Sequence, residues 1–382
     1  MARLRSLARC IVAALLWVVA ALAVAENGVS DREILLGQSA AFTGTTTGQP
    51  AAYRQGAQLY FDRINRDGGV HGRKIKVVSL DDGLVPERAA ANAKRLIEKE
   101  GVFALVNFTW TKPVAAVLPI VAQARVPFFG AYTGFDGLYA PGQRYVFTTR
   151  ASFRDELQYI IHHLTSLHLN RIGLVYYDID GSAGLLLDQV TEMLRRRGLK
   201  PAALAQMKLN SGDAAAAVGV ISAAKPDAVI IGTSGRDAVA FVRGMAETSA
   251  RPMYYARSLI NTDVLYRELG PLAVGIAVTE TAPNPYKHLG NAAREYRRLL
   301  NESNPKGKPQ YIEFEGYLSA KVLVEALRRA GKTLTRAKFI AALESMSNWD
   351  AGGYVVDYSA HKHHGSRFVD IVMIGRDGRI VD

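Results

Sequence analysis

Cysteine is nearly absent from this sequence, and its scarcity excludes several kinds of site. Among 382 residues the only cysteine is Cys10, which rules out intramolecular disulfides, cysteine-based zinc sites and cysteine-ligated clusters. Signatures of catalysis are also missing. There is no Gly-x-Ser-x-Gly elbow, no phosphate-binding Walker loop and no dinucleotide glycine fingerprint after the first predicted strand. The sequence therefore predicts a protein that is not an enzyme and has no cofactor.

The chain also lacks a block of basic residues of the kind that binds nucleic acid. It carries 47 Lys and Arg against 35 Asp and Glu, but three of the arginines lie in the first 25 residues. Without that segment, 357 residues remain with 44 basic and 35 acidic side chains, and no Lys/Arg-rich stretch concentrates the excess. This moderate surplus indicates ordinary surface charge, so nucleic acid is not an expected partner.

The first 25 residues have the composition of a secretory signal. Three arginines precede an uncharged run from Cys10 to Val24, which ends in the small-residue cleavage signature Ala23-Val24-Ala25. The run is shorter than the roughly 20 apolar residues that span a membrane. We expect residues 1–25 to be a signal peptide that is removed on export to the periplasm. An uncleaved N-terminal anchor is the alternative.

Short apolar runs alternate with longer amphipathic segments along the rest of the chain. Helices are predicted over 50–66, from Pro86 onward and over 316–330, and strands over 34–37, 75–78, 103–106, 126–129, 172–175, 228–231, 253–256 and 276–278. This alternation is typical of βαβ units and of parallel sheets with helices on both faces. The length favours two such lobes over one continuous sheet. Near the C-terminus we expect a hairpin that pairs 354–356 with 368–372.

Two polar clusters are potential metal sites, and neither has a complete set of ligands. His361, His363 and His364 are close in sequence, but no carboxylate or further histidine lies at ligand spacing, so a solvated hairpin turn is expected. Asp81-Asp82-Gly83 resembles the start of a calcium loop without its later ligands. No metal is predicted.

A series of motifs resembles the leucine/isoleucine/valine-type periplasmic binding proteins of branched-chain amino acid ABC transporters. They cover nearly the whole chain after residue 25: Ala40-Ala41-Phe42-Thr43-Gly44, Ile64-Asn65-x-x-Gly68-Gly69-Val70-x-Gly72-Arg73, Asp180-Gly181-Ser182-Ala183-Gly184, Glu315-Gly316-Tyr317-x-Ser319-Ala320 and Gly365-Ser366-Arg367-Phe368-Val369-Asp370. The resemblance implies an α/β type I periplasmic-binding fold, in which a hinge of three crossovers joins two doubly wound parallel-sheet lobes. Lobe 1 would be 26–147 plus 280–352, and lobe 2 would be 148–279 plus 353–382.

The resemblance also implies a role. A monomeric periplasmic solute-binding protein would capture a small carboxylate-bearing ligand in the cleft between the lobes and deliver it to the permease subunits of an ABC importer. The alternative is the ligand-sensing subunit of a signalling or regulatory system, because the same fold serves both.

The family's binding loops can be carried over onto this sequence. In lobe 1 they imply that Thr109 and Thr133, with neighbouring backbone NH groups, bind a ligand carboxylate. The other ligand-binding candidates that the resemblance implies are Gln49, Trp110, Ala131 and Tyr132 in lobe 1, and Asp180, Thr233, Ser234 and Arg257 in lobe 2. Trp110 has a core position as its alternative, and Asp180, Thr233 and Ser234 have helix capping as theirs.

One departure from the family concerns the ligand itself. Amino-acid binders of this family have an acidic residue after the strand that is predicted here at 253–256, whereas this chain has Arg257. An enclosed ammonium without a carboxylate is costly, and Asp180 is the one replacement that the sequence suggests. We therefore expect leucine, isoleucine and valine to bind poorly. Arg257, with Trp110, Tyr132 and Tyr286, favours an aromatic or dicarboxylic acid.

Overall fold

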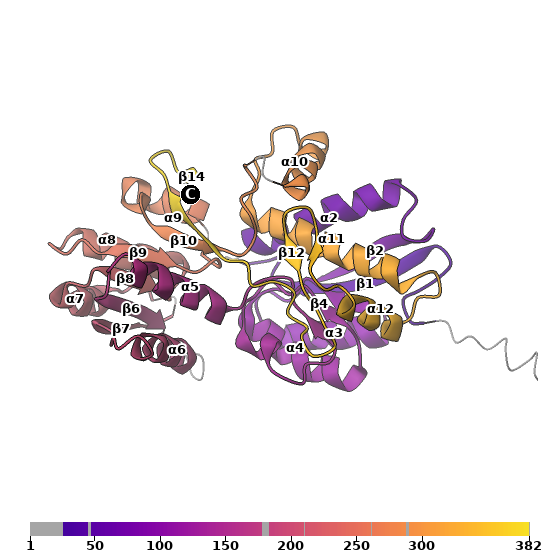
Figure 1. Cartoon of the computed structure of the whole chain (residues 1–382), viewed down its shortest axis with the longest axis horizontal. Helices are drawn as coiled ribbons and strands as arrows, with labels where there is room; N and C mark the ends of the chain where they lie inside the picture. Colours follow the sequence, from indigo (N-terminus) through magenta and orange to yellow (C-terminus); the bar gives the residue numbers. More distant parts are fainter. Residues whose placement is uncertain are drawn as a thin grey trace, which may run out of the picture.

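The computed structural model describes residues 26–44, 47–177, 183–209, 211–260, 262–287 and 290–381. The expected signal segment, residues 1–25, and the candidate Asp180 lie outside these ranges. Within them, no helix is both long and apolar enough to cross a membrane. The chain forms two lobes that lie side by side, and it passes between them three times (Figure 1).

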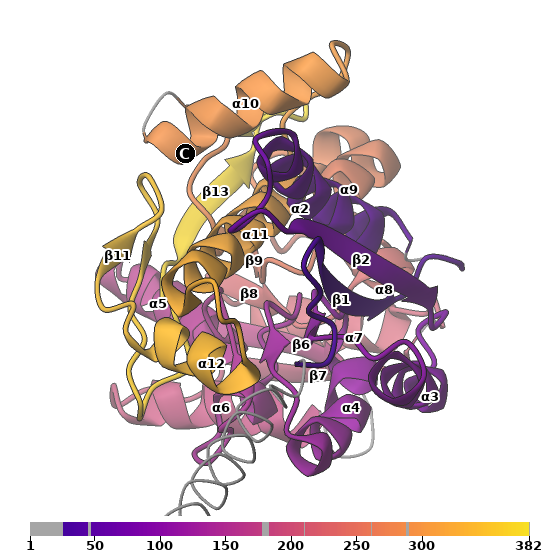
Figure 2. The ribbon, with the colours of Figure 1, turned by 90° about the vertical axis from the view of Figure 1, so that its right-hand side faces the viewer.

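The first lobe is built on a parallel sheet in the order β2-β1-β3-β4-β5. Its strands are β1 (Glu33–Ala40), β2 (Lys74–Asp81), β3 (Ala104–Val106), β4 (Phe128–Phe129) and β5 (Val146–Phe147). Side chains alternate between its faces, as a pleated strand requires. Leu36 and Val106 pack on one side with α2 (Gly48–Arg66), α10 (Asn291–Ser303), α11 (Tyr311–Ala330) and α12 (Arg336–Glu344). Leu105 and Phe128 pack on the other side with α3 (Pro86–Glu98) and α4 (Thr111–Ala124). Figure 2 shows α3 and α4 away from α2 and α11.

The second lobe repeats this arrangement in a sheet of order β14-β13-β10-β9-β8-β6-β7. The parallel strands are β6 (Ile172–Tyr177), β7 (Ala203–Met207), β8 (Ala228–Ile231), β9 (Met253–Ala256) and β10 (Ala277–Glu280). The antiparallel strands β13 (Asp370–Ile374) and β14 (Ile380–Val381) complete one edge. Ile230 packs with α5 (Phe153–Ser166) and α6 (Ala183–Arg195), and Ile231 packs with α7 (Ala215–Ala224), α8 (Gly235–Ala246) and α9 (Thr262–Leu269). The predicted fold class is confirmed.

Helices α2 and α11 cross at a point where only glycine fits. A Cβ at Gly56 would lie 1.6 Å from the carbonyl oxygen of Glu313, and one at Gly316 would lie 2.0 Å from that of Tyr53. Because both neighbours are backbone atoms, neither can move aside cheaply. Gly316 belongs to one of the motifs on which the family resemblance rests. The close helix crossing is the physical reason why this motif has glycine at that position.

The C-terminal hairpin prediction is wrong. Residues Val355–Val356 (β12) pair with Trp349–Asp350 (β11), whereas β13 pairs with β10 and β14. Tyr354, Val356 and Tyr358 are buried in the core of the first lobe, so the structure places them in lobe 1, unlike the expected division at residue 352. Alternating apolar residues favour any strand partner equally, and only packing selects between them.

Only part of the histidine segment is the solvated turn that the sequence suggested: His361 is exposed in a turn, whereas His363 and His364 are partly buried. The backbone oxygen of His363 accepts a hydrogen bond from Thr148 N, and Gly365 N donates one to the Thr148 oxygen, so this segment runs beside the first crossover. The His363 ring is stacked on Phe147 at 3.9 Å and lies 3.1 Å from Glu344. These contacts give His363 a structural role where two crossovers meet.

A buried charge network joins the lobes at the hinge. Arg150 lies on the first crossover with its side chain fully buried, 3.6 Å from Glu156 of lobe 2 and 3.6 Å from Glu315 of α11. It also donates a hydrogen bond to Ser258, which in turn donates one to Glu156. Burial opposes its charge, but the carboxylates of Glu315 and Glu156 more than compensate, so the pKa of Arg150 is raised.

Glu313 should make the protein less stable as the pH rises. Burial raises the pKa of this carboxyl group from 4.5 to about 7, so the folded chain holds the proton more tightly than the unfolded chain does. Its contribution is most favourable below about pH 4.5 and is lost as the pH rises through about 7. The free energy of unfolding therefore decreases as the pH rises, and Glu313→Gln should remove up to about 3 kcal/mol of that decrease.

Urea unfolding across pH 4.5–8 measures the effect of Glu313→Gln. The matched control is Glu98→Gln, at an exposed carboxylate on α3, which should leave the slope of stability against pH unchanged. The carboxyl groups of Glu280 and Glu315 also have raised pKa values because they are buried, so part of the fall remains in the variant. A slope equal to that of the parent protein would contradict the prediction.

Candidate ligand-binding cleft

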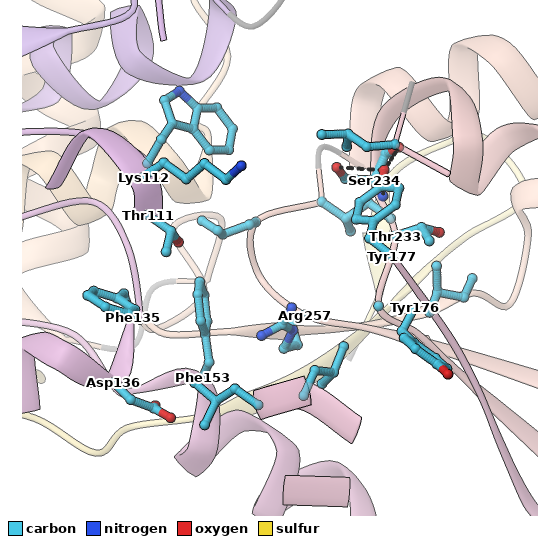
Figure 3. A pocket seen from close by; sticks show the side chains of 18 of the residues that line it. Thr111, Lys112, Phe135, Asp136, Phe153, Tyr176, Tyr177, Thr233, Ser234 and Arg257 are labelled. Carbon is cyan, nitrogen blue, oxygen red and sulfur yellow. Dashed lines mark hydrogen bonds between the residues drawn. The ribbon is translucent and has the colours of Figure 1, made fainter. Parts of the chain in front are cut away.

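A cavity of about 610 Å³ lies between the lobes, lined by residues that follow the carboxyl ends of β2, β3 and β4 in lobe 1 and of β6, β7, β8 and β9 in lobe 2. Its volume is in the range of small-molecule sites. In parallel sheets, ligands bind at this edge, where the loops after the strands converge. Figure 3 shows side chains of both lobes facing this space.

The lining is mainly apolar and aromatic. Lobe 1 contributes Leu84, Pro86, Trp110, Pro113 and Phe135; lobe 2 contributes Phe153, Tyr176, Tyr177, Leu185, Leu186, Leu209, Ile231, Leu259 and Ile260. Such a surface provides hydrophobic contact for the body of a ligand, and its few polar groups determine orientation.

Arg257 is the main positive group of the cavity. Its guanidinium carbon is 4.4 Å from the centre of the Phe153 ring, and both side chains project into the space between the lobes (Figure 3). The side chain is partly buried, and it makes no hydrogen bond or ion pair with the residues that the structure describes. Burial lowers its pKa, while Glu156 and Asp136 oppose this. A cation held in this way is prepared for an anionic ligand group.

Asp136 is a carboxylate in the cavity that the sequence reasoning missed. It lies in a single 3-10 turn, Asp136–Tyr139, after β4, and accepts a hydrogen bond from Gln189 of α6, which also lines the cavity. Burial raises the pKa of Asp136, and Gln189, Arg154 and Arg257 counteract the effect. The inference that only Asp180 could replace the family's acidic residue was therefore wrong. The position of Asp136 after a strand end was the available signal.

The remaining polar groups lie at the ends of β3 and β8. Thr233 and Ser234 line the cavity directly after β8. The Thr233 hydroxyl is buried with no hydrogen-bond partner among the described residues, whereas Ser234 is bonded to the Tyr177 hydroxyl through its backbone. After β3, Thr111 lines the cavity and Lys112 is an exposed cation at its edge.

The ten candidate residues separate into three groups. Trp110, Thr233, Ser234 and Arg257 line the cavity. Gln49, Thr109, Ala131, Tyr132 and Thr133 are buried and are not among the described lining residues, and Asp180 lies outside the described ranges. Gln49 nevertheless connects the lobes, since its side chain donates a hydrogen bond of 2.9 Å to the Leu259 oxygen. Tyr286 packs on Tyr311 and is not among these lining residues either.

Trp110 has a strained backbone at the start of α4. Its φ of 69° and ψ of 147° lie in a region that residues with side chains rarely adopt, at a cost of about 1–3 kcal/mol. The ring packs edge-on against Tyr132 at 6.3 Å. Strain of this kind persists where surrounding contacts fix a side chain in position, and here the fixed side chain is the indole that lines the cavity.

A pair of threonine variants tests the expected carboxylate loops. Thr133 Oγ1 accepts a hydrogen bond from Phe135 N and lies 3.0 Å from the hydroxyl of the lining residue Thr111. Thr133→Val should therefore release Thr111 and weaken acid binding about fivefold, the effect of one hydrogen bond. Thr109→Val should leave affinity unchanged and should not lower the melting temperature, because the Thr109 hydroxyl has no partner among the described residues. Calorimetric titration measures the affinity of both variants for the acid. A larger loss of affinity in Thr109→Val than in Thr133→Val would contradict this interpretation.

The comparisons with known proteins agree with this architecture. The sequence profile of the family described as "Periplasmic binding protein" matches residues 33–379. The Leu/Ile/Val-binding protein homolog 7 of Brucella abortus is 24% identical over 371 residues, covering 92% of this chain and 91% of that protein. An amino acid binding protein of Pseudomonas aeruginosa is 23% identical over 241 residues, covering 62% of this chain and 64% of that protein.

A solved structure gives the same result for the fold. A possible leucine/isoleucine/valine-binding protein from Rhodopirellula baltica is 26% identical, with a TM-score of 0.83 over 93% of this chain and 97% of that one. The resemblance inferred from the motifs is thus confirmed. The chain belongs to the periplasmic binding protein family, whose members bind small molecules and are not enzymes.

Proposed function

We propose that this chain is the substrate-binding protein of an ABC importer and that it captures an organic acid with a flat, apolar body. The observation that carries the proposal is Arg257, a guanidinium stacked on Phe153 in a mainly apolar cleft, with no anion bound to it among the described residues. A guanidinium binds carboxylates through two parallel hydrogen bonds. The carboxylate of the ligand supplies the missing partner.

The shape and charge of the cleft support an aromatic acid over an aliphatic amino acid. Trp110, Phe135 and Phe153 line the cavity with flat apolar surface that suits a ring. Lys112 adds a second positive charge at the edge, so an anion is favoured over a zwitterion. We expect leucine, isoleucine and valine to bind poorly because the Arg257 charge repels their ammonium group.

Ligand capture is accompanied by closure of the lobes. Gln49 of lobe 1 bonds to Leu259 of lobe 2, and Gln189 of lobe 2 bonds to Asp136 of lobe 1. A ligand that contacts both lobes stabilises the arrangement in which these bonds form, which is the hinge mechanism of two-lobed binding proteins. The closed, loaded form is the one that would be presented to the permease.

Titration with matched ligands tests the proposal. The protein without residues 1–25 is titrated with benzoate, benzamide, a dicarboxylate such as terephthalate, and leucine, by calorimetry and by melting temperature. Benzoate should bind and raise the melting temperature, with about 2.7 kcal/mol of added stability at 100 times the dissociation constant. Benzamide has nearly the same shape without the charge and should bind far more weakly. Micromolar leucine binding that survives Arg257→Ala, with no benzoate signal, would return the protein to the amino-acid binders.

A further inference from the structure

Asp136 gives the cavity a second fixed polar point, of opposite charge to Arg257. Both side chains line the same cavity, Asp136 from lobe 1 and Arg257 from lobe 2. They are close enough that each influences the pKa of the other. In Figure 3 the Phe153 ring stands between them. A ligand that occupies the cavity therefore meets a hydrogen-bond donor at one point and a carboxylate at another.

Asp136 has capacity for one further donor. Its Oδ2 accepts the hydrogen bond from Gln189, while Oδ1 has no hydrogen-bond partner among the residues that the structure describes. A carboxylate offers about four acceptor positions, and leaving them empty in a partly buried site is costly. The pKa of this group is raised by burial, consistent with an incompletely solvated carboxylate. A ligand donor at Oδ1 would satisfy it without displacing Gln189.

The charges of the cavity decide which kind of donor fits. Arg257, Lys112 and Asp136 together carry one net positive charge, which the carboxylate of the ligand neutralises. An ammonium group on the ligand would add a further positive charge, whereas a hydroxyl donates a hydrogen bond without adding charge. Hydroxyl groups also occur on aromatic rings at positions remote from the carboxylate, which suits two polar points that come from opposite lobes.

We propose that the cleft selects hydroxylated aromatic acids, with the carboxylate on Arg257 and the ring hydroxyl donating to Asp136. This inference rests on the proposed function and specifies its ligand class. Because Asp136 also receives the Gln189 bond from the opposite lobe, the ligand hydroxyl joins the same carboxylate that connects the lobes. The hydroxyl thereby stabilises the closed form as well as the bound ligand.

Calorimetry with ring-substituted acids tests the proposal. Benzoate, 3-hydroxybenzoate, 4-hydroxybenzoate and the two corresponding methoxybenzoates are titrated in one buffer. At least one hydroxybenzoate should bind about tenfold or more tightly than benzoate, as expected for a hydrogen bond to a charged group. Its methoxy counterpart accepts but does not donate, so it should show no such advantage.

Two variants test whether Asp136 causes the preference for a hydroxybenzoate over benzoate. The affinity ratio of the preferred hydroxybenzoate to benzoate should fall below about threefold in Asp136→Ala and should persist in Asp188→Ala, which removes an exposed carboxylate of α6 that is not among the lining residues. Melting temperatures of the unliganded variants verify that both fold. An unchanged ratio in Asp136→Ala, or no preference for any hydroxybenzoate in the parent protein, would overturn this inference while leaving the proposed function intact. If none of these acids binds, the proposed function fails, and this inference fails with it.

Discussion

Arg257→Met should reduce affinity for the bound aromatic acid by a factor of about 100 or more. Removing one partner of a desolvated charge pair costs roughly 2–5 kcal/mol, because the other charge stays enclosed without compensation. Methionine preserves the length and apolar contact of the side chain against Phe153 and removes only the charge and the donors. The affinity of Arg257→Lys should lie between those of the parent protein and Arg257→Met, since an ammonium keeps the charge but cannot form the paired hydrogen bonds of a guanidinium.

The same variant should not destabilise the unliganded protein. Arg257 is partly buried and has no ion pair among the described residues, and an uncompensated buried charge opposes folding. The melting temperature of Arg257→Met without ligand should therefore equal or exceed that of the parent. Lys112→Met is the matched control, because this exposed cation lines the same cavity and should cost less than about fivefold in affinity. Comparable losses for the two variants would show that general positive charge, and not Arg257, binds the acid.

Arg150→Met should lower the free energy of unfolding by about 3–5 kcal/mol, the cost of breaking a buried ion pair by removing one partner. The variant leaves the carboxylates of Glu156 and Glu315, both nearly inaccessible to solvent, without their shared cation. Glu280 is buried nearby, and its pKa is raised by burial and by the charges of Glu315 and Glu156. Among the described residues, Glu156 would then have only hydroxyl and amide partners and Glu315 only a hydroxyl partner.

Urea unfolding at pH 5 and pH 8 measures this loss. The loss should be smaller at pH 5, because Arg150 lowers the pKa values of Glu315 and Glu280, and without it these two carboxyl groups are protonated at lower cost. Arg150→Met combined with Glu315→Gln should recover part of the stability. Arg95→Met is the control, since its pair with Glu100 is exposed and 3.1 Å long and should contribute less than about 1 kcal/mol. A loss for Arg150→Met no greater than that of the control would show that the hinge network does not support the fold.

Part of the cleft followed from the sequence alone. The family resemblance implied Trp110, Thr233, Ser234 and Arg257 as ligand-binding residues, in loops that follow predicted strands, and all four line the cavity. Strand ends are readable because the apolar run that forms a buried strand ends where the chain reaches solvent. Phe153 and Gln189 were missed because they lie on α5 and α6, which only the docking of the lobes brings to the cleft, whereas Asp136 follows the end of β4 and could have been found by that position.

The pattern of the sequence was sufficient to predict the α/β class, the two-lobed architecture and the family. Apolar periodicity determines strands and helices locally. A glycine such as Gly316 indicates a close helix crossing, because no larger residue fits there. The partners of β12 and β13, the structural role of His363, the placement of Arg150 between two carboxylates, and the presence of Asp136 and Arg257 in one cavity became known only from the tertiary structure. All four depend on contacts between segments distant in the chain, and the energies of such contacts arise from packing and burial that local pattern does not contain.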